Sequence, residues 1–395
     1  MTDTLQRAVR EDAAIRRVRR LQPAGGAGDK LFPPTYPADE RNAPPRHVFE
    51  TRRIDGVERK CVLIDSVQSQ ANRLEEGLLR AARAGRCSLP RITVDFSGTD
   101  LAEIGEISTL EAPHRVFDAI LRDAEVDGKA FRNTASGSRL LKARMNDATA
   151  LFELSPTALV FGAWNSTGGG GLGAKFPRCL VSEIVGVGAA LGERTSSRID
   201  PLGIRRDVEV WKGEGGAWDV DPKGLKKAKK VRPSEINHGN ITPSVVPLGV
   251  TIDYALHTVV VSLAGLRRLS FPSNGRVDDE RDIAARTVLA TLALLAVLEQ
   301  DAQGYALRSR CDLVCDGAAS FEFVHPDGSV KPFDLDVVNA AKLLVRTVEE
   351  ARRRGLTWDP APLRLTPQPR LVEIVRRSRE KVLAGEGEEG GEAAE

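Results

Sequence analysis

The feature that most constrains the fold is an apolar run near the C-terminal end, IAARTVLATLALLAVL at 283–298. It is shorter than the roughly 20 apolar residues that a membrane-spanning helix needs. We therefore expect a core helix in a soluble protein. The chain of 395 residues is long enough to surround such a helix, and 41% apolar with only 5% aromatic residues predicts an aliphatic core.

Strand-like and helix-like patterns interleave along the chain, with long irregular insertions between them. This rhythm favours an α+β fold with a ferredoxin-like (split βαβ) core and inserted lobes, rather than a barrel or a doubly wound sheet. The patterns predict a strand–helix unit at 60–85, strands at 91–96, 157–164, 305–314 and 320–324, helices at 113–124, 177–187, 280–300 and 334–354, and one or two strands with an Asn274-Gly275 turn within 249–275.

Composition divides the chain into parts. Residues 1–47 hold a short amphipathic segment and a Pro/Gly-rich connector, 48–375 form the body, and the acidic end, 376–395, is expected to be disordered. The insertion at 192–247 is rich in Gly, Lys and Arg. It is read either as a projecting, mobile hairpin that carries Trp211 and Trp218 or as a solvated loop.

Charge is balanced overall but unevenly placed. Lys and Arg number 57 against 55 Asp and Glu, and basic clusters stand at 16–20, 223–232 and 351–355. Any affinity for nucleic acid must therefore depend on where the charges lie and not on their sum.

Cofactor and metal chemistry find little support. The five cysteines lack a CxxC pair and are expected to be reduced, mostly buried thiols of a cytoplasmic protein, and the N-terminus contains no signal-peptide pattern. The histidines have no metal-ligand spacing, and His257 lies in an apolar strand where a structural role is expected. The two carboxylates of WDVDP (218–222) are read as a turn. We expect no cofactor, no metal and no catalytic residue.

The first candidate binding surface is the helix within VLIDSVQSQANRLEEGLL, at 62–79. A core stripe of Val67, Ala71, Leu74 and Leu78 leaves two polar flanks. The members are Ser66, Gln70 and Arg73 on one flank, and Gln68 and Asn72 on the other. These side chains can donate to phosphate, sugar or base edges near a helix N-terminus, or Ser66 simply caps the helix while the amides face water.

The second candidate is the glycine-rich stretch WNSTGGGGLGAKFPR at 164–178. It fits neither the P-loop nor the dinucleotide-binding spacing. Its polar residues suit a polyanion backbone better than ATP, and a plain flexible loop is the alternative. The candidate contacts are Asn165, Ser166, Thr167, Lys175 and Arg178.

Four motifs together resemble a known family: LIDSVQSQANRLEEGLL, LVFGAWNSTGGGGLGAKFPRCLVSEIVG, SRIDPLGIR and RPSEINHGNITPS, in this order. They are similar to the backbone subunit of type I-G (formerly I-U) CRISPR effector (Cascade) complexes, a Csb-type member of the RAMP superfamily within the Cas-seven family. The resemblance covers about 50–350.

This resemblance implies a modified RRM-like palm with an inserted thumb and finger-like lobes, polymerised in several copies along one CRISPR RNA. The implied partners are CRISPR RNA, target DNA paired through the guide, further copies of the chain, other subunits and a separate helicase–nuclease, without a membrane. The palm would contact the RNA through the two candidate surfaces above. The thumb at 192–247 would bring seven cations close to the RNA: Arg198, Arg205, Arg206, Lys226, Lys227, Lys229 and Lys230.

Two catalytic alternatives stay open at this point. Related backbone subunits of type III complexes cut RNA with a loop aspartate, for which Asp200 or Asp219 would be the candidates, although SRIDP also reads as a structural turn. A repeat-processing endoribonuclease would use His238. An ordinary RRM is disfavoured, since the chain lacks its paired-aromatic strand motif.

Overall fold

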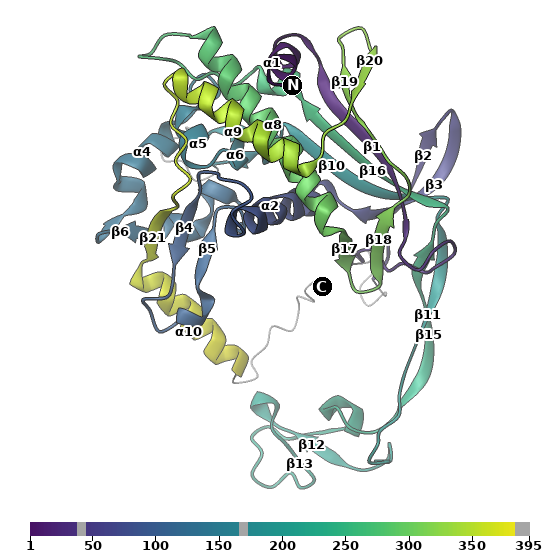
Figure 1. Cartoon of the computed structure of the whole chain (residues 1–395). Helices are drawn as coiled ribbons and strands as arrows, with labels where there is room; N and C mark the ends of the chain where they lie inside the picture. The colour runs from purple at the N-terminus through teal and green to yellow at the C-terminus, as the bar shows by residue number, and fades with distance from the viewer. Residues whose placement is uncertain (38–44, 166–172, 384–395) are drawn as a thin grey trace.

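The computed structural model describes residues 1–37, 45–165 and 173–383, and its fold is α+β (Figure 1). Within these residues, the largest sheet has nine strands, all joined by antiparallel pairs, and we call it the main sheet. Along the sheet its strands run β17 (Tyr305–Arg308), β18 (Cys311–Cys315), β1 (Ala14–Pro23), β16 (Tyr254–Ser262), β10 (Leu180–Val187), β3 (Val57–Asp65) and β2 (Phe49–Ile54), while β19 (Phe321–Val324) pairs with β1 and β20 (Val330–Phe333).

Helices cover one face of the main sheet, and the core lies between the two layers (Figure 1). Along β16, alternate residues such as His257 and Val259 are fully buried, whereas their neighbours are half-buried. The apolar run at 283–298 lies in the expected core helix, and none of the helices in the described residues has the length and apolar character to span a bilayer. The covering helices are α1 (Thr2–Glu11), α2 (Val67–Arg83), α8 (Asp279–Gln303) and α9 (Val337–Arg353).

The N-terminal segment is part of the body, so the expected boundary at residue 48 is wrong. Helix α1 buries Leu5 and Val9, and β1 lies inside the main sheet, paired with β16 over its length. The basic cluster at 16–20 alternates across this strand. Arg17 points into the core, where it is 1% exposed and pairs with Asp301 at 2.5 Å.

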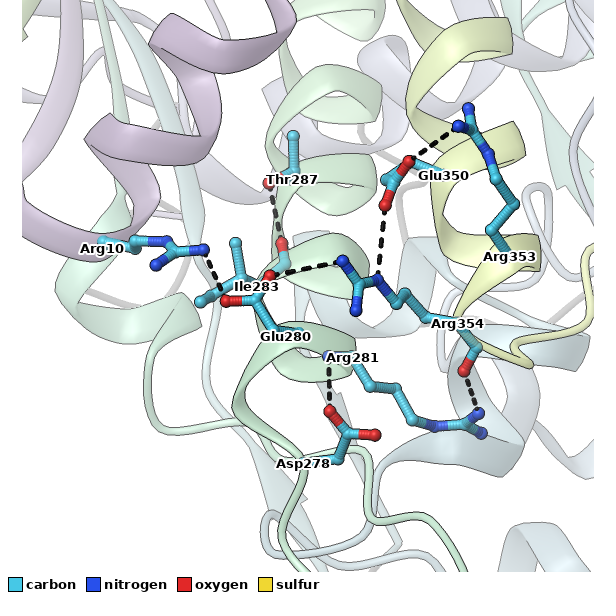
Figure 2. Close-up of polar contacts among 9 residues, drawn as sticks. All are labelled: Arg10, Asp278, Glu280, Arg281, Ile283, Thr287, Glu350, Arg353 and Arg354. Atoms are coloured by element: carbon cyan, nitrogen blue, oxygen red, sulfur yellow. Dashed lines mark hydrogen bonds and ion pairs between the residues drawn. The ribbon is translucent and has the colours of Figure 1, made fainter.

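An ion-pair cluster fastens α1 to the helical layer (Figure 2). Arg10 pairs with Glu280 at 2.8 Å, and Arg354, just beyond α9, lies 3.5 Å from the same carboxylate and 3.3 Å from Glu350. The Arg281 guanidinium donates to the Arg354 carbonyl at 2.7 Å. This part of the basic cluster at 351–355 therefore serves contacts within the fold.

A second, smaller sheet has its strands in the order β5 (Glu106–Ser108), β4 (Ile92–Asp95), β21 (Leu363–Pro367), β6 (Ala124–Val126) and β7 (Lys129–Ala130). Helix α10 (Pro369–Leu383) follows β21, so residues 376–383 belong to a helix and not to the expected acidic tail. The rest of that tail, 384–395, lies outside the described residues.

Two predicted elements are exchanged. The expected helix at 177–187 is the strand β10, and the expected strand at 157–164 is the helix α6 (Thr157–Phe161) followed by the short β8 (Ala163–Trp164). Strand β10 is rich in valine and is paired on both sides, by β16 and β3, which outweighs the helix-start signal of Pro177. The helix expected at 113–124 is only a turn at Arg115–Phe117 and the short α3 (Ala119–Arg122).

The remaining predicted elements are confirmed, including the turn at Asn274-Gly275, where both residues have positive φ, 49° and 74°. The short helices α4 (Ala135–Lys142), α5 (Thr149–Leu154) and α7 (Leu263–Leu266) complete the body.

The insertion projects from the body, as expected (Figure 1). Strands β11 (Ala190–Arg198) and β15 (Ile241–Thr251) pair as an antiparallel ribbon. The ribbon leads to residues 199–240, which we call the lobe. There β12 (Val210–Lys212) pairs with β13 (Trp218–Asp219) and β14 (Lys229–Val231), which confirms a hairpin that carries Trp211 and Trp218. The expected mobility of this segment stays a prediction.

Candidate functional site

The first polar flank of α2 faces the interior. Ser66 caps the helix by accepting the Ser69 N–H at 3.3 Å. The Gln70 side chain is fully buried and donates to Asp65 at 2.6 Å, and Arg73 donates to the same carboxylate at 3.0 Å and to the Leu307 carbonyl at 2.5 Å. Gln70 is therefore turned away from any ligand, contrary to expectation, because the carboxylate of buried Asp65 needs its donor. Arg73 is half-buried, and its contact with RNA stays a prediction.

This flank begins a chain of buried hydrogen bonds that crosses the core. The Ser182 hydroxyl donates to Gln70 at 2.8 Å and lies 2.7 Å from Nε2 of His257. Nδ1 of His257 lies 3.2 Å from the Tyr305 hydroxyl, which in turn donates to Asp301. Burial lowers the pKa of His257 to about 3, so the ring is neutral, and its predicted structural role is confirmed.

The second polar flank of α2 faces solvent and forms one wall of a hollow of about 620 Å³. Gln68 and Asn72 are both exposed there, one helical turn apart. The turn at 113–115 and the paired strands β8 and β9 (Lys175–Phe176) form the other walls. We call this feature the α2 hollow, and its polar and aromatic lining includes Gln68, Asn72, His114, Trp164, Lys175 and Arg178.

The β8–β9 pair carries the glycine-rich stretch to the edge of the hollow. Trp164 lies opposite Lys175, and Ala163 lies opposite the buried Phe176, which anchors the pair in the core. Gly162, with φ at 85°, precedes the pair, and a Cβ there would lie 3.1 Å from the Phe176 carbonyl oxygen. The local geometry therefore fixes Trp164 and Lys175 at the surface.

The other glycine-loop predictions divide three ways. Asn165, an expected RNA contact, is only 4% exposed, and its backbone N–H donates to the Ala174 carbonyl at 2.9 Å, which closes the base of the loop. Ser166 and Thr167 lie outside the described residues. Lys175 is exposed, and half-buried Arg178 lines the hollow while its Nε donates to the Phe161 carbonyl at 3.1 Å.

A buried ion pair supports the floor of the hollow. Arg115 contacts both carboxylate oxygens of Glu75, at 2.7 and 2.6 Å, and also donates to the Gly162 carbonyl at 3.1 Å. Burial raises the pKa of Glu75 to about 7, against the opposing effect of Arg115. Burial and the nearby Arg115 also lower the pKa of Arg178. These contacts hold the turn at 113–115 against α2.

Where the ribbon meets the lobe, polar side chains form hydrogen bonds with backbone groups. Arg198 is half-buried and donates to the His238 and Gly239 carbonyls at 2.8 and 2.9 Å, while its expected contact with nucleic acid stays a prediction. The Asp200 carboxylate accepts the backbone N–H groups of Leu202, Ile204 and Gly239, which lowers its pKa and confirms the turn reading of SRIDP.

The remaining predicted cations of the lobe are exposed. Arg205 pairs with Asp207 at 3.0 Å, and an open cavity lies beside this pair, lined also by Arg206 and Arg232. Two of the predicted lysines pair with carboxylates of the lobe, Lys227 with Glu214 and Lys230 with Glu209. The other two predicted lysines, Lys226 and Lys229, are exposed.

Within 1–37, 45–165 and 173–383, no group of histidine, cysteine or carboxylate side chains is arranged to hold a metal ion. All the cysteines are free thiols, and Cys61, Cys179 and Cys311 are buried. His238, the candidate of the endoribonuclease alternative, lies edge-on to Trp218, with ring centroids 5.6 Å apart.

Sequence reasoning missed three residues of the hollow, His114, Arg115 and Trp164. The stretch at 113–124 was read as a helix, which hid the turn that brings His114 and Arg115 to α2. Trp164 was assigned to the end of a strand at 157–164. Its place at the start of the glycine-rich stretch was the available signal for exposure.

Part of the chain, which includes the α2 hollow, matches the model of a known protein family. Residues 15–191 match the model of a family described as CRISPR-associated protein GSU0053, and no curated protein matches. The chain is similar to Csc2 of Thermofilum pendens, with 12% identity over 89% of this chain and 80% of that chain, at a TM-score of 0.28. It is also similar to a chain of a CRISPR RNA-guided surveillance complex, pre-nicking, with 11% identity over 92% and 99% of the two chains and a TM-score of 0.33.

Proposed function

We propose that this chain is a non-catalytic, guide-RNA-binding backbone subunit of a type I-G CRISPR effector complex. The observation that carries the proposal is the α2 hollow. It combines the exposed amides of Gln68 and Asn72 with the cations Lys175 and Arg178. All four residues lie in the segment that matches the CRISPR-associated family model, 15–191.

The chemistry of the hollow suits RNA held by its sugar–phosphate backbone. Amide groups donate to phosphate and accept from ribose hydroxyls, and a lysine neutralises phosphate without reading a base. A subunit that serves many guides has to leave the Watson–Crick edges free for pairing with target DNA. A net charge of +2 is compatible with this role, because several copies on one RNA would each neutralise only a few phosphates.

On this proposal the body is a modified RRM-like palm, and the ribbon and lobe are its thumb. Copies of the chain would assemble side by side along CRISPR RNA in the cytoplasm, together with other subunits of the complex. Target DNA would pair with the exposed guide, and a separate helicase–nuclease would cut it.

The absence of catalysis is part of the proposal. Asp200 would be the aspartate of an RNA-cleaving subunit, but its carboxylate is occupied by backbone donors. The assembled complex, incubated with complementary RNA and magnesium, is expected to leave that RNA intact. Periodic cleavage that disappears in Asp200→Ala would contradict the proposal.

Binding of single-stranded RNA to the purified protein tests the site. The double variant Gln68→Ala/Asn72→Ala is expected to weaken binding about tenfold for two unrelated sequences, since each hydrogen bond removed contributes about 0.5–1.5 kcal/mol. The matched control is Lys342→Ala/Arg346→Ala, which removes two exposed cations from α9. A larger loss in the control, or a loss for only one sequence, would contradict the proposal.

A further inference from the structure

The side chain of Trp164 is unusually exposed for a tryptophan. Its relative exposure is 63%, whereas Trp358 is 3% exposed in the core. Tryptophan is a large apolar side chain that proteins usually cover, and an exposed one at the edge of a concave surface indicates a contact partner.

The backbone of Trp164 is held firmly in place. Strand β8 pairs with β9, so that Trp164 and Lys175 lie opposite each other. The N–H of Asn165 donates to the Ala174 carbonyl at 2.9 Å, and both Phe161, just before β8, and Phe176, in β9, are buried. An aromatic ring on such a base loses little conformational entropy when it binds a flat ligand.

The neighbours of the ring identify the class of ligand. Lys175 is a cation on the adjoining strand, and the amides of Gln68 and Asn72 line the same hollow. An aromatic face beside a cation and uncharged donors is the combination by which proteins bind single-stranded nucleic acid. Bases stack on the ring while the backbone follows the charges.

We propose that Trp164 is a stacking platform for one nucleobase of the bound RNA strand, with Lys175 on an adjoining phosphate. The inference rests on the proposed function, since it presumes that the α2 hollow binds RNA. Every base presents a π-face, so this contact adds affinity without sequence preference.

Fluorescence isolates this residue. In the full-length variant Trp211→Phe/Trp218→Phe, the lobe tryptophans are gone and the exposed indole emission comes from Trp164, since Trp358 is buried. Saturating single-stranded RNA is expected to quench this emission and to reduce its quenching by acrylamide. RNA that binds while both signals stay unchanged would overturn the stacking proposal.

Affinity provides the second measurement. Trp164→Ala is expected to weaken RNA binding about 5- to 150-fold, because one stacked base is worth about 1–3 kcal/mol. Trp164→Phe keeps an aromatic face and is expected to lose less than Trp164→Ala. Equal affinities of the parent protein and Trp164→Ala would overturn the stacking proposal alone, whereas a parent protein that fails to bind RNA would overturn the proposed function.

Discussion

The α2 hollow and the lobe both present groups that suit a polyanion, but they present them in opposite ways. The hollow has few charges, and buried contacts fix their positions: Arg115 pairs with Glu75 beneath its floor, and Phe176 anchors its rim. The lobe has many exposed cations at the end of a ribbon, and several of them pair with carboxylates of the lobe, as Arg205 does with Asp207.

The two regions are therefore expected to contribute to RNA binding in different ways, the hollow by its fixed geometry and the lobe by its charge. A hollow that is built on core contacts can position a strand, whereas exposed cations on a projection attract it with little orientation. The match to the CRISPR-associated family model includes every residue named for the hollow and ends at 191, before the lobe. We therefore expect positioning to depend on the hollow and salt-sensitive attraction to depend on the lobe.

The largest effect is expected from the ion pair beneath the hollow. Arg115→Met leaves the Glu75 carboxylate buried without its partner and should lower the free energy of unfolding by about 3–5 kcal/mol. Lys230→Met breaks the exposed pair with Glu209 in the lobe and should cost less than about 1 kcal/mol. Urea unfolding of both variants measures the contrast, and equal losses would contradict it.

A control separates the missing partner from impaired packing. Glu75→Leu/Arg115→Met removes both charges, so it should recover most of the stability that Arg115→Met forfeits. A double variant as unstable as the single one would show that the shape of the pair, and not its charge, supports the turn at 113–115.

The buried hydrogen-bond chain predicts a pH dependence. The pKa of His257 is about 3 in the folded state and about 6.5 when unfolded, so below pH 6.5 the unfolded chain binds a proton that the folded chain does not. The free energy of unfolding should therefore fall as the pH falls below 6.5, and His257 should contribute a loss of about 2 kcal/mol at pH 5 relative to neutral pH.

Comparison of variants isolates that contribution. His257→Gln should lose this part of the pH dependence, whereas His238→Gln in the lobe should keep the slope of the parent protein. Unfolding free energies at pH 7 and pH 5 test this, and identical slopes for the parent protein and His257→Gln would contradict it.

The salt dependence of RNA binding should distinguish the two regions. Lys226→Ala/Lys229→Ala removes two exposed cations of the lobe and is expected to reduce the slope of log affinity against log salt by up to about 1.4, because each phosphate that a lysine neutralises adds about 0.7 to that slope. Gln68→Ala/Asn72→Ala should leave the slope unchanged while it weakens binding. The opposite pattern would assign the charge contacts to the hollow.

The smallest effect is expected from shortening the lobe. Replacement of 212–230 by a short Gly-Ser linker should change the stability of the body by less than about 0.5 kcal/mol, since those residues lie apart from the core (Figure 1). Thermal unfolding of the shortened chain checks this. A large fall in its midpoint would show that the lobe supports the body.

The elements that the sequence predicted correctly are those with a strong local pattern. Helices α2, α8 and α9 follow from apolar periodicity. Strand β10 and helix α6 were exchanged because their identity depends on what lies beside them: β10 is placed by β16 and β3, which come from distant parts of the chain. Strand β1 was missed for the same reason, since its arginines are matched by partners such as Asp301 and Glu322.

The candidate site was predictable to a similar degree. Helical periodicity separated the flank of Gln68 and Asn72 from that of Gln70 and Arg73, but it could not tell which flank the core would cover. That choice depends on Asp65 and Ser182, which lie beside Gln70 in the fold. The other walls of the hollow, at 113–115 and at Trp164, lie about 40 or more residues after Gln68 and Asn72 in the sequence. No local pattern indicates that these segments lie close to α2 in the fold.

The central claim, that RNA lies in the α2 hollow, can be tested most directly by photo-crosslinking. Single-stranded RNA bound to the full-length protein would be irradiated with ultraviolet light, and the linked peptides identified by mass spectrometry. We predict crosslinks at Trp164 and Lys175 that become clearly weaker in Gln68→Ala/Asn72→Ala when the RNA concentration is below saturation. Crosslinks confined to the lobe or to the open face of the main sheet, with none at the hollow, would contradict the claim.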